Sequence, residues 1–269
     1  MSVNTEIHPS AIVSKHADIG VGVQIGPFSV IEEGVQIGDH SIIKSHAVIY
    51  RGTTLGSGCH VHPQAVIGDT PQDLTFQESE TYVKIGSHCV FRECVTVHRG
   101  TKEGSSTVVG DDCFIMACSH VAHNVKLGNQ VVLANGALLG GYVEIGDQVF
   151  VAGVEGIHQF VRVGRLAMVG GGGGVSKDVP PFCTVHSVRL NEVSGLNSIG
   201  LKRAGLNPDE RKEVKRAFDF LYNSSLNVTQ AVEHIKEQCS GPFVEEFVQF
   251  IESSKRGICQ RNRTSRVEC

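Results

Sequence analysis

Two neighbouring histidines form the part of the sequence best suited to acid–base chemistry. They are His120 and His123, and Asn124 directly follows the second of them. An imidazole titrates near neutral pH, so it can take a proton from a hydroxyl or an amine and return it later. The amide oxygen of an asparagine can orient such a ring by accepting its N–H. This segment is therefore the first candidate for a catalytic site.

Nine of the other histidines fall into an early and a late group. The late ones lie in the same part of the chain as His120 and His123, and we expect the chemistry among them: His88, His98 and His158. The early ones are expected to sit at corners of the fold without a catalytic role: His8, His16, His40, His46, His60 and His62.

The elements that carry these histidines are indicated by a repeat with a period of six residues. Every sixth residue from Ile7 to Ile67 is aliphatic, and the same register runs from Val109 to Val175. A period of six cannot keep one face of an α-helix buried, but it suits a short strand followed by a corner. Three such units close a triangular coil, and coils stack through parallel strands. The pattern predicts a parallel β-helix.

The register is interrupted at two places near the candidate site. It fails at Asp73 and Ser79 and again at Glu103, which predicts loops over 70–81 and 100–106 inserted in whole multiples of six. Val121 is an inward position, so His120 and His123 flank it on the outer surface. A neighbouring subunit could close a cleft there.

The tail has a different pattern. Pro208 precedes an amphipathic stretch, and further helices are expected near 228–238 and 243–253. We predict a β-helix domain over 1–188, a helical domain over 189–255 and a disordered tail over 256–269.

Composition narrows the functional classes. A formal net charge of −4 gives no reason to expect nucleic-acid binding, and no apolar run approaches the ~20 residues of a membrane span. The nine cysteines include no CxxC pair, which argues against disulfides and structural zinc. Cys59, Cys89 and Cys113 fall in the small inward column and are interpreted as core. A cytoplasmic protein without membrane insertion is expected.

Six short blocks carry a resemblance to a known family. They are PQDL at 71–74, HRGT at 98–101, HVAHN at 120–124, GIHQF at 156–160, VPPF at 179–182 and GLKR at 200–203. In this order they resemble the UDP-N-acetylglucosamine O-acyltransferases that open lipid A synthesis. The resemblance implies a left-handed β-helix, a homotrimer and no cofactor or metal. It also implies transfer of a 3-hydroxyacyl chain from acyl carrier protein to the sugar's 3-hydroxyl.

The same resemblance implies roles for individual residues. His123 would be the general base, supported by Asn124 and with His120 beside the reacting groups. The substrate-binding positions implied are Asp73, Tyr142, His158, Gln159, Asn197 and Arg203, and Gly171 would border the acyl-chain pocket. Basic residues of the tail would dock the acidic carrier protein: Lys202, Arg203, Lys212, Lys215, Arg216, Lys255 and Arg256.

Four positions depart from the family's pattern. Thr75 stands in place of a Lys, Tyr142 of a His, Ala204 of an Arg and Asn124 of an Asp. An amide oxygen stabilises an imidazolium less well than a carboxylate does, which predicts a slower enzyme. The loss of two cations leaves open an unusual acceptor, such as a UDP 3-aminosugar that receives an amide.

Two further alternatives stay open at this point. His98, His120 and His123 could bind zinc as in γ-type carbonic anhydrases, and the repeat could be a non-catalytic scaffold. Glu155 occupies a small inward position, where an unpaired carboxylate is costly, so a bulge or a buried partner is expected.

Overall fold

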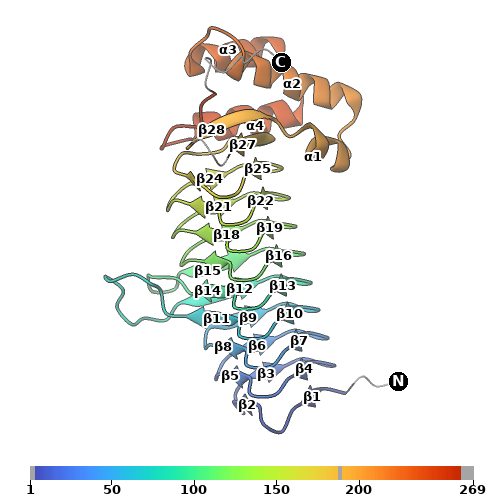
Figure 1. The fold of residues 1–269 in the computed structure, drawn as a ribbon, viewed down its shortest axis with the longest axis vertical. Helices are drawn as coiled ribbons and strands as arrows, with labels where there is room; N and C mark the ends of the chain where they lie inside the picture. The colour runs from blue at the N-terminus through green and yellow to red at the C-terminus, as the bar shows by residue number, and fades with distance from the viewer. Residues whose placement is uncertain (1–3, 187–189, 262–269) are drawn as a thin grey trace.

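The chain winds into a long three-sided β-helix with a group of α-helices at its C-terminal end (Figure 1). The structure is a computed structural model, and it describes residues 4–186 and 190–261. Each coil contributes one short strand to each of three sheets, named here A, B and C. Their strands are parallel, except that the last strand of sheet A, β28, pairs antiparallel with β27.

The strands of each sheet stack in chain order. Sheet A contains β1 (Glu6–Ile7), β4 (Gln24–Ile25), β7 (Ile42–Ile43), β10 (His60–Val61), β13 (Val90–Phe91), β16 (Phe114–Ile115), β19 (Val132–Leu133), β22 (Phe150–Val151), β25 (Met168–Val169), β27 (Cys183–His186) and β28 (Glu192–Leu196). Sheet B contains β2 (Ile12–Val13), β5 (Val30–Ile31), β8 (Val48–Ile49), β11 (Val66–Asp69), β14 (Thr96–His98), β17 (His120–Val121), β20 (Leu138–Leu139), β23 (Gly156–Ile157) and β26 (Gly174–Val175). Sheet C contains β3 (Asp18–Ile19), β6 (Gln36–Ile37), β9 (Thr53–Leu55), β12 (Tyr82–Ile85), β15 (Ser106–Val109), β18 (Lys126–Leu127), β21 (Glu144–Ile145) and β24 (Arg162–Val163).

The predicted inward column forms the core. Ile115, Leu133 and Val151 are paired in successive coils of sheet A and are fully buried. Burial of such a side chain stabilises the fold by roughly 1.5–3 kcal/mol. The cysteines at 59, 89 and 113 also lie in this core, as predicted.

The two predicted insertions leave the β-helix at the same corner. One connects β11 to β12 and the other connects β14 to β15, and β11, β14 and β17 are neighbours in sheet B. Loops therefore project from the β-helix at the level of β11 and β14 (Figure 1). This arrangement places both insertions beside the turn that carries His123.

Four helices follow the last coil: α1 (Ser198–Arg203), α2 (Pro208–Tyr222), α3 (Val228–Gln238) and α4 (Pro242–Glu252). The start of α2 is set by a capping box between Asn207 and Glu210. Arg165 of the β-helix pairs with Glu246 of α4 at 2.6 Å, which fixes this helix to the last coils. No helix in 4–186 or 190–261 is long and apolar enough to cross a membrane.

The prediction of a disordered tail from residue 256 is wrong for residues 256–261. Ile258 forms a parallel bridge with Asp178, and Gln260 forms one with Glu192. Ile258 and Cys259 are buried, so the apolar pair anchors this segment against the end of the β-helix. The rest of the predicted tail, 262–269, lies outside the described residues.

Candidate active site

A groove of about 620 Å³ runs along the outer face of sheet B and the corner that follows it. One end contains His98, His120 and His123, and His158 and Gln159 line it two coils further along the β-helix. The remaining lining is mostly apolar or glycine: Gln72, Ala122, Leu138, Leu139, Gly140, Gly141, Gly156, Ile157, Gly174, Val175, Ser176 and Leu190. The groove therefore combines histidines that can exchange protons with a largely apolar surface.

His123 lies half-buried in the turn after β17. Its Nδ1 is 3.1 Å from Oδ1 of Asn124, and its ring meets Tyr142 edge-on with centroids 5.4 Å apart. A Cβ atom at Gly141 would lie 2.3 Å from Cε1 of His123. The imidazole thus packs directly on the backbone of the next coil, and only glycine leaves room for it.

His120 is held in a neutral form. Its Nδ1 is 2.7 Å from Oγ1 of Thr96, and its ring contacts His98 edge-on at 4.8 Å between centroids. Burial lowers the pKa of His120 to about 4, with smaller contributions from His98 and His123. Burial also lowers the pKa of His98. Neither ring is expected to be charged at neutral pH.

Asp73 lies on the first inserted loop, within electrostatic range of His123. Its Oδ1 accepts hydrogen bonds from the backbone N–H of Thr75 at 2.9 Å and from the Thr75 hydroxyl at 2.8 Å. These two bonds lower the pKa of Asp73, and the charge of His123 contributes less. The threonine that replaces a lysine therefore holds the carboxylate in place.

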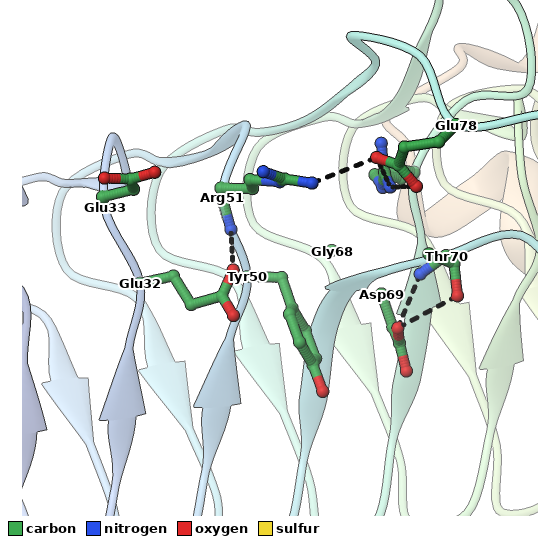
Figure 2. A pocket seen from close by; sticks show the side chains of 9 residues that line it. Glu32, Glu33, Tyr50, Arg51, Gly68, Asp69, Thr70 and Glu78 are labelled. Carbon is green, nitrogen blue, oxygen red and sulfur yellow. Dashed lines mark hydrogen bonds and ion pairs between the residues drawn. The ribbon is translucent and has the colours of Figure 1, made fainter.

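A second pocket of about 510 Å³ lies where this loop returns to the β-helix (Figure 2). The buried Arg99 donates to both oxygens of Glu78 at 2.7 and 2.9 Å, and to Ser79 O and Thr81 Oγ1. Arg51 also binds Glu78, and its backbone N–H bonds Glu32 (Figure 2). Arg51 and Arg99 thus hold the end of the loop that returns to the β-helix through their bonds to Glu78.

The predicted site residues Asn197, Arg203 and Gly171 do not line the groove. Asn197 caps α1 through Gly200 N and donates to Leu166 O, so both ends of its amide are engaged. Arg203 is exposed at the end of α1. A Cβ atom at Gly171 would lie 2.4 Å from Gly153 O, which shows tight packing between coils.

Arg256 is a neighbour of the groove whose position the sequence did not reveal. Its Nη2 is 3.3 Å from Nδ1 of His158, and its Nε donates to Ser176 O at 3.2 Å. The sequence had indicated it only as one of the basic residues of the tail. The bridge at Ile258 explains its position, because it returns the tail to the β-helix.

Glu155 is buried, with 1% of its surface exposed. Its Oε2 accepts a hydrogen bond from Gly173 N at 2.9 Å, which supplies the expected buried partner. Its Oε1 has no hydrogen-bond partner in the described part of the chain, and burial raises the pKa of the carboxyl.

The zinc alternative has no geometric support. Within 4–186 and 190–261, no group of three or more His, Cys, Asp or Glu side chains is placed to hold a metal ion. This includes His98, His120 and His123, whose rings pack edge-on or hydrogen-bond to threonine and asparagine.

The coils and the groove define a hexapeptide-repeat transferase. The family described as bacterial transferase hexapeptide matches residues 16–51, 34–69 and 106–141. The second domain of UDP-N-acetylglucosamine O-acyltransferase matches residues 178–259. The chain belongs to the UDP-N-acetylglucosamine O-acyltransferase family.

Two curated relatives carry the name acyl-[acyl-carrier-protein]–UDP-N-acetylglucosamine O-acyltransferase. The one from Thermodesulfovibrio yellowstonii is 41% identical over 95% of this chain and 99% of its own. The one from Syntrophobacter fumaroxidans is 42% identical over 94% of this chain and 99% of its own.

Solved structures agree with this membership. A UDP-N-acetylglucosamine acyltransferase from Bacteroides fragilis is 37% identical, covers 94% of this chain and 99% of its own, and has a TM-score of 0.91. The enzyme from Campylobacter jejuni is 35% identical, covers 96% of this chain and 100% of its own, and has a TM-score of 0.90. The fold is thus the predicted left-handed parallel β-helix with a C-terminal helical part.

Proposed function

We propose that the chain transfers a 3-hydroxyacyl group from acyl carrier protein to the 3-hydroxyl of UDP-N-acetylglucosamine, the first step of lipid A synthesis. The relatives that match over nearly the whole chain are named for this donor and this acceptor. The single observation that carries the proposal is the pairing of His123 with Asn124 at the head of an apolar groove. The arrangement suits deprotonation of a hydroxyl beside a bound acyl chain.

His123 acts as the general base in this proposal. Its Nε2 takes the proton of the sugar hydroxyl as the oxygen attacks the thioester carbonyl. A C–O bond forms, the C–S bond breaks, and the proton passes to the departing thiolate of the carrier. His120 is neutral at working pH, so it adds no competing positive charge near the base.

The remaining predicted residues have binding roles in the proposal. Asp73 meets the acceptor sugar, while His158, Gln159, Asn197 and Arg203 meet the nucleotide and diphosphate. A guanidinium such as that of Arg203 suits phosphate oxygens. Arg256 lies beside His158 and adds a cation near the groove, where Thr75 and Ala204 supply none.

A homotrimer is part of the proposal. The outward side chains in the middle and upper part of sheet A form an apolar column: Val90, Phe114, Val132, Phe150 and Met168. Phe150 and Met168 remain 36% and 39% exposed in the single chain. Such a column suits contact with another subunit. Light scattering of the purified protein tests the trimer.

The other proposed partner and location follow from the same reaction. The acyl carrier protein docks on the basic residues that the sequence indicated in the tail, all of which are exposed except the half-buried Arg216. In the proposal the protein works in the cytoplasm together with this donor.

The function is tested by offering the purified protein 3-hydroxyacyl carrier proteins of several chain lengths. The acceptors are UDP-N-acetylglucosamine and its 3-amino analogue, and products are identified by mass spectrometry. We expect an ester on the natural sugar. Preference for the amino analogue would favour N-acylation, and transfer to neither sugar would leave a non-catalytic β-helix.

A further inference from the structure

Asn124 and Tyr142 occupy the same corner in successive coils. Both adopt left-handed backbone conformations, with φ of 59° and 60°, and Phe160 follows in the next coil with φ of 65°. The rings of Tyr142 and Phe160 stack with centroids 5.0 Å apart and planes 13° apart. The phenol is therefore fixed between Phe160 and the edge-on ring of His123.

Thr101 connects these two residues. It lies on the second inserted loop, and its Oγ1 is 2.9 Å from Asn124 Oδ1 and 2.8 Å from the Tyr142 hydroxyl. Its backbone nitrogen is 3.1 Å from the same Asn124 oxygen. Two positions at which the chain departs from its family's pattern are thus joined through one threonine.

The directions of these hydrogen bonds follow from the chemistry of the groups. A backbone N–H only donates, so the Asn124 atom that faces Thr101 N is the carbonyl oxygen and not the amide nitrogen. The Thr101 hydroxyl also gives its only hydrogen to this acceptor. Tyr142 must therefore be the donor in its bond to Thr101.

The orientation of Asn124 decides the protonation of His123. Because Oδ1 is an acceptor, the Nδ1 of His123 at 3.1 Å carries the hydrogen. In the neutral imidazole Nε2 then has a free lone pair. That tautomer can accept a proton from a hydroxyl at Nε2, whereas a flipped amide would favour the tautomer that cannot.

We propose that Thr101 and Tyr142 are positioning residues that hold Asn124, and through it His123, in the tautomer that acts as a base. This inference rests on the proposed function and adds residues to its site. Tyr142 acts through its hydroxyl on Thr101, and Thr101 prevents rotation of the Asn124 amide. The chain replaces a carboxylate, which has two equivalent oxygens, by an amide whose orientation must be fixed from outside.

The kinetic test compares Thr101→Val, Thr101→Ser and Tyr142→Phe with the unaltered protein. Valine keeps the shape and the backbone N–H but removes the hydroxyl, so kcat should fall about tenfold while both KM values stay within about twofold. Serine should restore most of kcat. Tyr142→Phe should lower kcat about threefold, since it leaves the direct bond from Thr101 intact.

Thr54→Val is the matched control. Thr54 is an exposed threonine on sheet C, and its hydroxyl bonds only Gln36 in the described contacts. This variant should leave kcat and both KM values unchanged. Equal kcat in Thr101→Val and the unaltered protein would overturn the inference, and so would a loss that Thr101→Ser does not restore.

The tautomer is measured separately from activity. Protein with ¹⁵N-labelled histidine rings gives distinct signals for protonated and unprotonated nitrogens, and the His123 signals are those absent from His123→Ala. We expect a single Nδ1–H form in the unaltered protein and a mixture in Thr101→Val. An Nε2–H form in the unaltered protein would contradict the inference. Inactive unaltered protein would instead refute the proposed function, while the tautomer result would still stand.

Discussion

Sheets B and C are built from the same repeat, yet their outer faces differ. The outward residues of sheet B around the site are Thr96, His120, Leu138, Gly156 and Gly174. Those of sheet C in the same coils are Val108, Lys126, Glu144 and Arg162. The inward residues of both sheets are buried aliphatic side chains. The repeat thus sets the fold, and the outward positions are free to set chemistry.

The two outer faces also differ in how far water reaches their ionisable side chains. Lys126 and Glu144 form an ion pair at 3.0 Å with both side chains about half exposed. Such pairs contribute about 0–1 kcal/mol. On sheet B partial burial of His120 lowers its pKa to about 4. The neighbours of His120 are Thr96 and His98 of the adjacent strand, whereas Lys126 and Glu144 face solvent.

Gly141→Ala should show the largest effect of a conservative change at the sheet B corner. The added Cβ would displace the His123 ring, so we expect kcat to fall about a hundredfold with little change in melting temperature. Steady-state kinetics and thermal unfolding measure both. Gly195→Ala is the control, because nothing lies within 4 Å of its added Cβ. A kcat within twofold of the unaltered value would show that the ring tolerates displacement.

Arg99→Lys should weaken acceptor binding. The lysine keeps the charge but loses the two-pronged bond to Glu78, so the loop that carries Asp73 is less firmly held. The KM for the nucleotide sugar should rise about tenfold, and the KM for the carrier should change little. Arg92→Lys serves as control, since Arg92 pairs only with its neighbour Glu93 among the described ion pairs. An unchanged KM for the nucleotide sugar would show that the bond between Arg99 and Glu78 does not contribute to acceptor binding.

His120→Gln should remove part of the acid sensitivity of folding. The folded protein keeps His120 neutral down to about pH 4, whereas the unfolded chain binds a proton below about 6.5. Stability is therefore lost as pH falls from 6.5 toward 4, by roughly 1–2 kcal/mol after allowing for partial exposure. Urea unfolding at fixed protein concentration, across this range, measures the slope. The same slope in the variant would contradict the burial argument.

Glu155→Gln should remove a pH dependence of the opposite sign. Burial raises the pKa of this carboxyl above its ordinary value of 4.5, so its proton stabilises the fold at low pH. That contribution is complete below the unfolded value and is lost as pH rises through the folded value. The free energy of unfolding of the variant should fall less steeply than that of the unaltered protein as pH rises above 4.5. An unaltered decline would mean that the carboxylate is solvated.

Lys126→Gln should have the smallest effect. The variant breaks the exposed pair with Glu144 on sheet C, and we expect a change in unfolding free energy below about 0.5 kcal/mol. Acyl transfer should be unaffected. A measurable loss of activity would show that the outer face of sheet C takes part in function, for instance through carrier docking.

Much of the fold could be predicted because the core depends on residues at a fixed spacing. Ile115, Leu133 and Val151 stack because each coil returns to the same register, and the inserted loops were visible as breaks at Asp73 and Glu103. The helices after Pro208 followed from ordinary start signals and apolar periodicity. Composition could not predict that the tail segment 256–261 is ordered, because its order depends on the bridges that Ile258 and Gln260 form with distant residues.

The candidate site could be predicted only in part. The motif around His123 and Asn124 indicated a candidate base, but the residues that contact it come from the next coil and from an inserted loop. No spacing in the chain relates Thr101 to Tyr142, since the loop path decides their contact. The same holds for Arg99, whose burial against Glu78 depends on how the first loop returns.

Acyl transfer by His123→Ala tests the central claim most directly. The measurement compares single-turnover rates of the variant and the unaltered protein with saturating 3-hydroxyacyl carrier protein and UDP-N-acetylglucosamine, together with calorimetric binding of the sugar. Loss of the base should lower the rate about a thousandfold while sugar affinity stays within a few fold. A variant that retains more than about a tenth of the rate would contradict the assignment of His123 as general base.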